Sequence, residues 1–310
     1  MQLIKQPLNI DFMGRRRLAL YVSAALLVVS VLALALRGLE LGIDFTGGTL
    51  IEVGYPQAVE LESVREALKD AGFKDAVVQH FGTSQDVLVR LVPREGLSSA
   101  DISTDVLRAL KGTGEPSMRR VEFVGPQVGD ELTEQGGLAM LGALFGILIY
   151  VMFRFEWRFA VGSVAALGHD VLIVLGIFAL FGFEFDLTVL AAVLAVIGYS
   201  LNDTIVVFDR IRENFRKIRK GSPEQVTNTS VNQTLARTLM TSFTTLLVLF
   251  ALFLLGGEVI HNFALALILG IVVGTYSSIY VASSAALALG ISKADLMPVK
   301  KEGADLDGRP

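Results

Sequence analysis

The chain has 310 residues, of which 52% are hydrophobic and 19% charged, and it contains no cysteine. A mean hydropathy of +0.57 excludes an ordinary soluble protein and is typical of a chain that crosses a membrane several times. With a net charge of −4, three histidines and no cysteine, the sequence gives no sign of a metal or cofactor site, and we expect neither.

Six apolar runs are long enough to cross a bilayer core of about 30 Å. The first covers 18–36, and the other five are predicted at 138–153, 159–181, 187–208, 239–255 and 263–289. The organisation predicted from these runs is a lead at 1–17, the first span at 18–36, a polar domain at 37–137, five spans within 138–289 with a loop at 209–236, and a tail at 290–310.

Lysine and arginine determine the predicted orientation. Sixteen lysine and arginine residues lie in four segments: before the first span, between the second and third, after the fourth and after the last. If the spans alternate in direction, these four segments are all on one side of the membrane. The loops 182–186 and 256–262 carry no lysine or arginine. The positive-inside rule therefore places both termini in the cytoplasm and 37–137 outside. The basic start resembles a signal peptide, but its apolar run exceeds the roughly 7–15 residues of a signal core, so we expect an uncleaved helix.

The polar domain shows a readable order of elements. Strands are expected at 50–53, 76–78, 87–91 and 121–124, and helices at 61–68 and 102–110. The order β-α-β-β-α-β is that of the ferredoxin-like fold, in which two helices cover one face of an antiparallel sheet. Its 10 basic and 17 acidic residues argue against a nucleic-acid surface, and His80 has no second potential metal ligand near it in sequence.

Glycine pairs border this domain on both sides. Gly47 and Gly48 lie just after the first span, and Gly136 and Gly137 just before the second. Glycine permits positive φ and close approach of backbones, so we predict hinges at both places. A simple turn between helix and strand is an equally good explanation of the first pair.

The third span carries a carboxylate near its centre. Gly162, Ala166 and Asp170 share one helical face, which forms a groove of small residues against which another helix could pack. Asp170 could make a structural hydrogen bond there or carry a proton. We expect His169, one residue away, to point elsewhere. In the sixth span Gly270 and Gly274, followed by Ser278, form a similar face for tight helix packing.

The fourth span contains Asp203 in the run Gly-Tyr-Ser-Leu-Asn-Asp-Thr at 198–204. A carboxylate at membrane depth costs roughly 2.5–3.5 kcal/mol on insertion scales, so it normally has a charge partner or a functional role. Asp203 lies about 8 Å from the middle of its span toward the cytoplasm. Arg237, at the start of the fifth span, reaches a similar depth, so we predict that the two form a pair.

Two further interpretations follow from the same residues. Ser200 and His169 could belong to an intramembrane serine protease, but the sequence at 198–202 lacks the second glycine of the Gly-x-Ser-x-Gly motif, and we do not expect an enzyme. Asp203 and Arg237 could instead be a static ion pair in a structural assembly subunit.

Five stretches together carry a resemblance to a known family. They are 41–48 (LGIDFTGG), 155–159 (FEWRF), 166–170 (ALGHD), 198–210 (GYSLNDTIVVFDR) and 234–239 (TLARTL). In this order and on these spans, they resemble the SecD/SecF family of bacterial protein-export membrane proteins, which belongs to the resistance-nodulation-division superfamily. Ala236 stands where relatives often have serine, and this departure leaves Arg237 intact.

The resemblance implies half of a proton-driven transporter, with six spans and an external domain after the first. Asp203 and Arg237 match the family's proton-relay residues, and Asp170 is a further candidate. The implied function is proton-driven promotion of late preprotein translocation across the bacterial inner membrane. The implied partners are SecD, which would cover the small-residue faces of the third and sixth spans, the SecYEG channel, YajC and unfolded preprotein, in contact with membrane lipids. The alternative is a half-unit of a small-molecule efflux transporter of the same superfamily.

Overall fold

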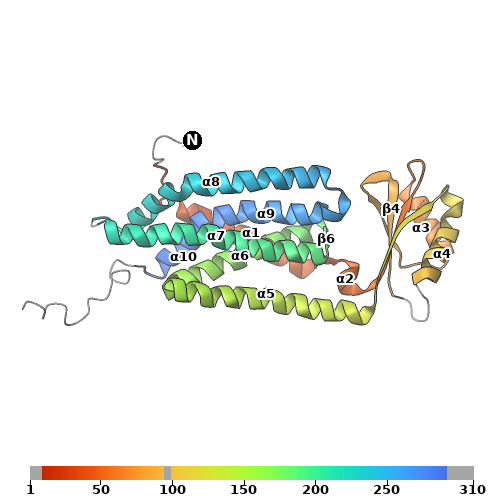
Figure 1. The fold of residues 1–310 in the computed structure, drawn as a ribbon, viewed down its shortest axis with the longest axis horizontal. Coiled ribbons are helices and arrows are strands. Elements are labelled where there is room, and N and C mark those ends of the chain that lie inside the picture. Colours follow the sequence, from red (N-terminus) through yellow and green to blue (C-terminus); the bar gives the residue numbers. More distant parts are fainter. Residues whose placement is uncertain (1–8, 94–98, 219, 292–310) are drawn as a thin grey trace, which may run out of the picture.

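A computed structural model describes residues 9–93, 99–218 and 220–291, and it shows a long helical bundle with an α/β domain at one end (Figure 1). Within these residues six helical segments are long and apolar enough to cross a membrane, which confirms the predicted number. They are α1 (Arg16–Leu36), α5 (Pro126–Arg154), α6 (Trp157–Phe181), α7 (Leu187–Lys217), α8 (Pro223–Leu255), and a last segment made of η2 (Glu258–Ile260), α9 (His261–Ser277), the π-helical η3 (Ser278–Ala282) and α10 (Ser283–Ala288). Most of the tail predicted at 290–310 lies outside the described residues.

Two helices extend beyond the predicted spans, so most of the connecting region predicted at 209–236 is helical. α7 runs on to Lys217 and α8 starts at Pro223, where Ser222 and Gln225 form a capping box. The buried side chain of Asn214 donates hydrogen bonds to Ser230 Oγ and Gln233 Oε1, each at 2.9 Å. The hydropathy pattern does not reveal these helical turns, because the contacts between α7 and α8 in this region are made by polar side chains.

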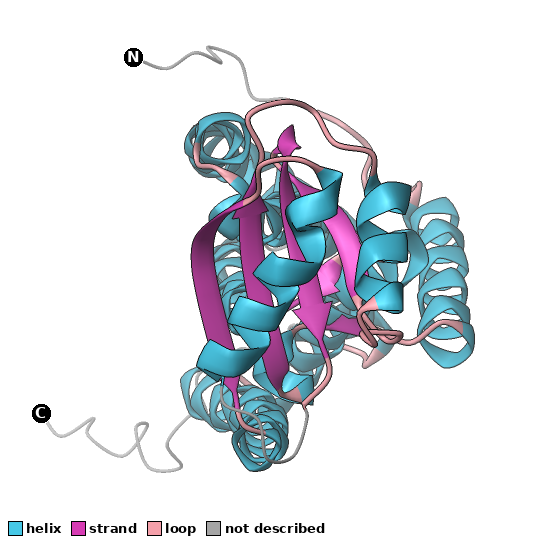
Figure 2. Ribbon diagram, turned by 90° about the vertical axis from the view of Figure 1, so that its right-hand side faces the viewer, coloured by secondary structure: helices cyan, strands magenta, loops and turns pink. Residues whose placement is uncertain are grey.

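The α/β domain has the predicted order of elements. It consists of β2 (Gly48–Gly54), α3 (Leu61–Asp70), β3 (Val77–Phe81), β4 (Thr83–Leu91), α4 (Ser99–Leu110), the short η1 (Lys111–Thr113) and β5 (Ser117–Val124). The antiparallel sheet has the order β3-β4-β2-β5, which is ferredoxin-like. Alternate strand residues such as Ile51, Val53 and Val89 face α3 and α4 in a separate core. The two helices cover the outer face of the sheet, and its open face looks toward the bundle (Figure 2).

A small parallel sheet, absent from the prediction, joins the domain to the bundle. β1 (Glu40–Leu41) pairs with β6 (Glu184–Phe185), which lies between α6 and α7. Arg90 of the domain donates a hydrogen bond to Leu41 O at 2.7 Å and lies 3.8 Å from Glu184 Oε1. Burial raises the pKa of the Glu184 carboxyl, and the opposing effect of Arg90 is smaller. Burial of Glu184 at this junction is therefore more favourable when its carboxyl is protonated, and the stability that this burial contributes is lost as the pH rises through the raised pKa. The ion pair with Arg90, which needs the ionised carboxylate, offsets only part of that loss.

The first glycine pair lies in a crowded junction after α2 (Ile43–Thr46). Gly47 has φ +67°, and a Cβ there would lie 2.9 Å from Cα of Pro126. At Gly48, with φ +133°, a Cβ would lie 2.4 Å from Leu91 O. Both positions require glycine because β4 and the start of α5 approach so closely. Asp44 of the same segment accepts a hydrogen bond from Leu187 N at 3.0 Å and so helps to cap α7.

The second glycine pair lies inside a helix and not in a connecting segment. α5 is continuous from Pro126, so the helix begins about three turns before the span predicted to start at 138. A Cβ at Gly136 would meet Leu190 of α7 at 2.8 Å, whereas nothing lies within 4 Å at Gly137. The glycines at 136 and 137 interrupt the apolar pattern in the sequence without interrupting the helix.

The centre of the bundle is formed by α6, α7 and the α9–η3–α10 segment, which supply most of its buried residues. A Cβ at Gly270 would lie 2.1 Å from Val196 Cγ2, and one at Gly274 would lie 3.0 Å from Ser200 Cβ. At Gly162 it would lie 3.3 Å from Ala282 O. The small-residue faces of the third and sixth spans therefore pack against each other and α7, and the expectation that a partner covers them is wrong. Most of the exposed large apolar residues of the bundle lie on α1, α5 and α8, with fewer on α6.

Candidate functional site

Asp203 lies at the meeting point of three helices and is 8% exposed. Its Oδ1 accepts a hydrogen bond from Thr238 Oγ1 of α8, and its Oδ2 accepts one from Ser278 Oγ of η3, both at 2.5 Å. Each carboxylate oxygen thus has one hydroxyl donor from a different helix. These donors stabilise the ionised form in a setting that otherwise disfavours charge.

Arg237 does not form the predicted ion pair with Asp203. It is exposed on α8, and the ion pairs found among the described residues do not include it. Successive residues of an α-helix point about 100° apart, so when Thr238 faces α7 its neighbour Arg237 cannot. The Arg237 charge acts on Asp203 only from beyond contact distance. Thr238 therefore contacts Asp203 where the sequence predicts the guanidinium of Arg237.

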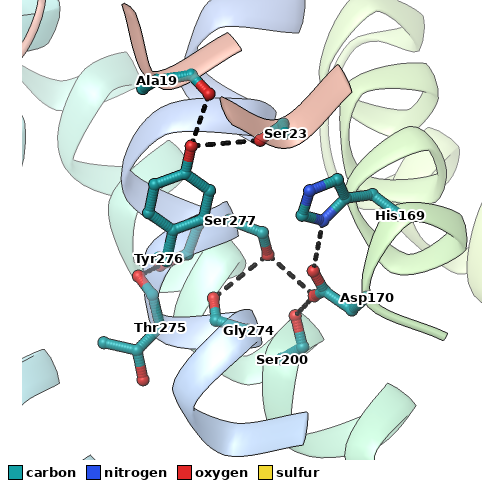
Figure 3. A network of polar contacts seen from close by, with 10 residues as sticks. Ala19, Ser23, His169, Asp170, Ser200, Gly274, Thr275, Tyr276 and Ser277 are labelled. Carbon is teal, nitrogen blue, oxygen red and sulfur yellow. Dashed lines mark hydrogen bonds and ion pairs between the residues drawn. The ribbon is translucent and has the colours of Figure 1, made fainter. Parts of the chain in front are cut away.

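A second carboxylate network surrounds Asp170, which is 1% exposed (Figure 3). Asp170 Oδ2 accepts hydrogen bonds from Ser200 Oγ at 2.6 Å and Ser277 Oγ at 2.7 Å. Its Oδ1 lies 2.9 Å from His169 Nδ1. The expectation that His169 points elsewhere is therefore wrong: the imidazole turns back onto the neighbouring carboxylate.

Two consecutive serines link the networks. Ser277 donates to Asp170 of α6, and Ser278 donates to Asp203 of α7. They lie where α9 passes into the π-helical segment η3, and π-helical turns within helices occur frequently at functional sites. Each hydroxyl also has a backbone acceptor in reach, Gly274 O at 3.1 Å for Ser277 and Thr275 O at 3.0 Å for Ser278. Each serine can therefore redirect its proton and accept one from its carboxyl group.

This arrangement favours reversible proton binding over nucleophilic catalysis by a serine or binding of a metal ion. Ser200 donates to Asp170 and not to His169, so the hydrogen bond that would activate a serine nucleophile is not formed among these residues. The described residues contain no group of three or more histidine, aspartate or glutamate residues that could hold a metal ion. Two buried carboxylates with reorientable donors are groups that can gain and lose a proton.

Sequence reasoning missed most of the donors. The sequence marks Ser278 only as the continuation of the small-residue face of Gly270 and Gly274, and it gives no signal for Thr238 or Ser277. A hydroxyl on an apolar span gives a weak signal because serine and threonine commonly bond to their own helix. Only the position of the facing carboxylate distinguishes Thr238 from Thr241, which bonds to the backbone of α8.

Comparison with known proteins agrees with this geometry. A family model described as "Protein export membrane protein SecD/SecF, C-terminal" matches residues 104–292, and one for the "SecD/SecF GG Motif" matches residues 32–59. The chain is 56% identical to the protein translocase subunit SecF of Vibrio alginolyticus over 100% of this chain and 99% of that protein. It is 48% identical to SecF of Escherichia coli O157:H7, over 95% of this chain and 93% of that one.

The fold is also that of a solved relative. The crystal structure of SecDF from Thermus thermophilus, a translocon-associated membrane protein, superposes with a TM-score of 0.83 at 43% identity. The match covers 93% of this chain but only 39% of the SecDF chain, so this chain corresponds to less than half of that protein. With a family model over more than half of its length and relatives of about 50% identity over nearly all of it, the chain belongs to the SecD/SecF family of protein-export membrane proteins.

Proposed function

We propose that this chain uses the proton gradient to promote late steps of preprotein translocation across the bacterial inner membrane, together with SecD. The observation that carries the proposal is Asp203, a buried carboxylate at the contact of three spans whose hydrogen-bond donors among the described residues are the hydroxyls of Thr238 and Ser278. The relatives of this chain are protein translocase subunits, and this favours protein export over small-molecule efflux as its function.

The proposed cycle alternates two states of Asp203. A proton entering from outside neutralises the carboxylate, Ser278 turns its hydroxyl toward Thr275 O, and the contact with Thr238 weakens. Loss of the proton to the cytoplasm restores the ionised state, in which Arg237 moves closer as charge partner and Asp170 serves as a neighbouring relay group. A proton moving down 100 mV supplies roughly 2.3 kcal/mol, enough to shift a two-state packing equilibrium more than tenfold.

The α/β domain is the part that we propose to move. It rests on the bundle through the small β1–β6 sheet and Arg90, and a cavity of about 220 Å³ lies between its open sheet face and the bundle, lined by His80, Phe183 and Asn262 among others. Gly47 and Gly48 are the proposed pivot, with flexing of α5 around Gly136 and Gly137. The domain would lie outside, with both termini in the cytoplasm, and would carry preprotein released by SecYEG.

A partner is expected because the bundle exposes apolar surface on its outer helices. α1, α5 and α8 expose apolar faces, and the chain matches only 39% of the SecDF chain, which supports SecD as the second half. Lipids would cover the faces that SecD leaves open. YajC is proposed as a further partner of the assembled complex.

The test is export by the chain co-reconstituted with SecD and SecYEG in lipid vesicles. We expect that completion of preprotein transport needs an imposed proton gradient and is lost when an ionophore collapses it. Vesicles that contain SecD without this chain are the control. Export that proceeds equally after collapse of the gradient would overturn the proposal, and gradient-dependent uptake of small molecules with no effect on preprotein would favour the efflux alternative.

The donor to Asp203 gives a sharper prediction. Thr238→Val keeps the shape of the side chain but removes a hydrogen bond to a charged group, which contributes about 1.5–3 kcal/mol, so we expect proton flux to fall roughly ten- to hundredfold. Thr241→Val is the matched control, because Thr241 on the next turn donates, among the described residues, to Arg237 O and Thr238 O of its own helix. Equal flux in both variants would contradict the role of Thr238.

A further inference from the structure

One nitrogen in the Asp170 network has no hydrogen-bond partner. His169 is 4% exposed, and its Nε2 is buried without a donor or acceptor among the described residues. In Figure 3 this nitrogen points to the side of the network where Ser23 and Tyr276 lie, while Nδ1 turns to Asp170. A buried unpaired nitrogen is costly and rare, so its presence calls for a role.

The proton positions follow from the partners. An ionised Asp170 only accepts hydrogen bonds, so the proton of a neutral His169 lies on Nδ1, 2.9 Å from Asp170 Oδ1. Nε2 then carries a free lone pair. A proton that binds there converts the ring to imidazolium, whose positive charge lies directly against the carboxylate.

Asp170 itself already accepts hydrogen bonds from three donors. It accepts from Ser200 and Ser277 through Oδ2 and from the imidazole through Oδ1, and the imidazole N–H cannot redirect its proton as a hydroxyl can. A proton on Oδ2 would require one of the serine hydroxyls to turn away, and a proton on Oδ1 would lie beside the imidazole N–H. A proton on His169 displaces no donor, since Nε2 has no partner to lose.

We propose that His169 is a second proton-binding residue of this chain, with Asp170 as its fixed counter-charge. The inference rests on the proposed proton-driven function and changes the role given there to Asp170, which becomes a positioning residue. Proton transfer involves only Nε2: the lone pair forms the new N–H bond when the proton arrives and is restored when it leaves.

The surroundings of His169 contain few other groups that could take the proton. Tyr276 of α9 stacks against the ring with centroids 6.4 Å apart, and its hydroxyl donates to Ala19 O at 2.6 Å and lies 3.0 Å from Ser23 Oγ. α1 and α7 face the network with the hydroxyls of Ser23 and Ser200, which carry no charge. Besides Asp170 and Tyr276, the titratable groups next to the network are Tyr280, whose ring centroid lies 5.2 Å from that of Tyr276, and Asp203, which is linked through the consecutive Ser277 and Ser278.

The substitution that tests this separates proton binding from positioning. In His169→Asn the amide nitrogen takes the place of Nδ1 and keeps the hydrogen bond to Asp170, but the side chain cannot bind a proton. We expect proton flux of the SecD complex in vesicles to fall about tenfold or more. If His169 only positions Asp170, His169→Asn keeps full flux and the proposal is wrong.

A spectroscopic measurement gives an answer that does not depend on flux. With only this chain labelled with ¹⁵N-histidine in the complex, the signal of His169 is identified as the one that disappears in His169→Asn. We expect its Nε2 resonance to change from the unprotonated to the protonated type as the pH is lowered. A resonance that stays unprotonated from pH 9 to pH 5 would overturn the proposal. Absence of gradient-dependent export in the wild type would overturn the proposed function alone, because the titration still reports on His169.

Discussion

Asp203→Asn is expected to yield a chain that inserts and folds normally and supports no proton-dependent export. Asparagine has nearly the same shape, and its amide oxygen can still accept from Thr238 or Ser278, so the contact of α7, α8 and η3 survives. Removal of a buried charge also lowers the cost of placing this position in the membrane, by part of the roughly 2.5–3.5 kcal/mol that an aspartate costs there on insertion scales. The variant loses only the ability to bind and release a proton.

The measurement compares export and proton flux in vesicles with those of a matched variant. The matched variant is Asp209→Asn. Asp209 lies nearly two turns further along α7, and its carboxylate is exposed and 3.3 Å from Arg154 Nη2. An exposed ion pair contributes at most about 1 kcal/mol, so this variant should retain export. Full export and full flux in Asp203→Asn would show that this residue does not drive the process, and the pair His169–Asp170 would become the next candidate.

Gly176→Val is expected to prevent stable folding of the bundle. A Cβ at Gly176 of α6 would lie 2.2 Å from Ser30 Cβ and 2.5 Å from Ser30 Cα of α1. Because the second of these atoms belongs to the backbone, a change of rotamer cannot relieve the clash, and α1 must move away. Overpacking typically costs about 1–3 kcal/mol, and we expect the upper end or more where a whole helix is displaced.

Thermal unfolding in detergent and the yield of folded chain would measure this effect. Gly168→Ala on the same helix is the control, since nothing lies within 4 Å of a Cβ there. Alanine in a helix interior is favoured over glycine by roughly 0.5–1 kcal/mol, so the control should be neutral or slightly stabilising. An unchanged melting temperature in Gly176→Val would mean that α1 does not pack on α6 as described.

Several features of this protein follow from local patterns in the sequence. Each membrane span is a run of apolar residues, and each strand or helix of the α/β domain has its own period, so the number of spans and the order of elements could be predicted. The ionisable residues Asp170 and Asp203 were identifiable for the same reason, because a charge within an apolar run is conspicuous without knowledge of its neighbours.

The partners of those residues were decided by the tertiary structure. Packing between the helices decides which face of α8 turns toward α7. Rotation of α8 about its axis by one residue position decides whether Arg237 or Thr238 faces Asp203. The pairing of β1 with β6, the internal packing of Gly270 and the turn of His169 onto Asp170 likewise join segments far apart in sequence or depend on the space between helices. A sequence records the period of each helix but not its rotation against its neighbours, and that rotation determines which donors surround a buried carboxylate.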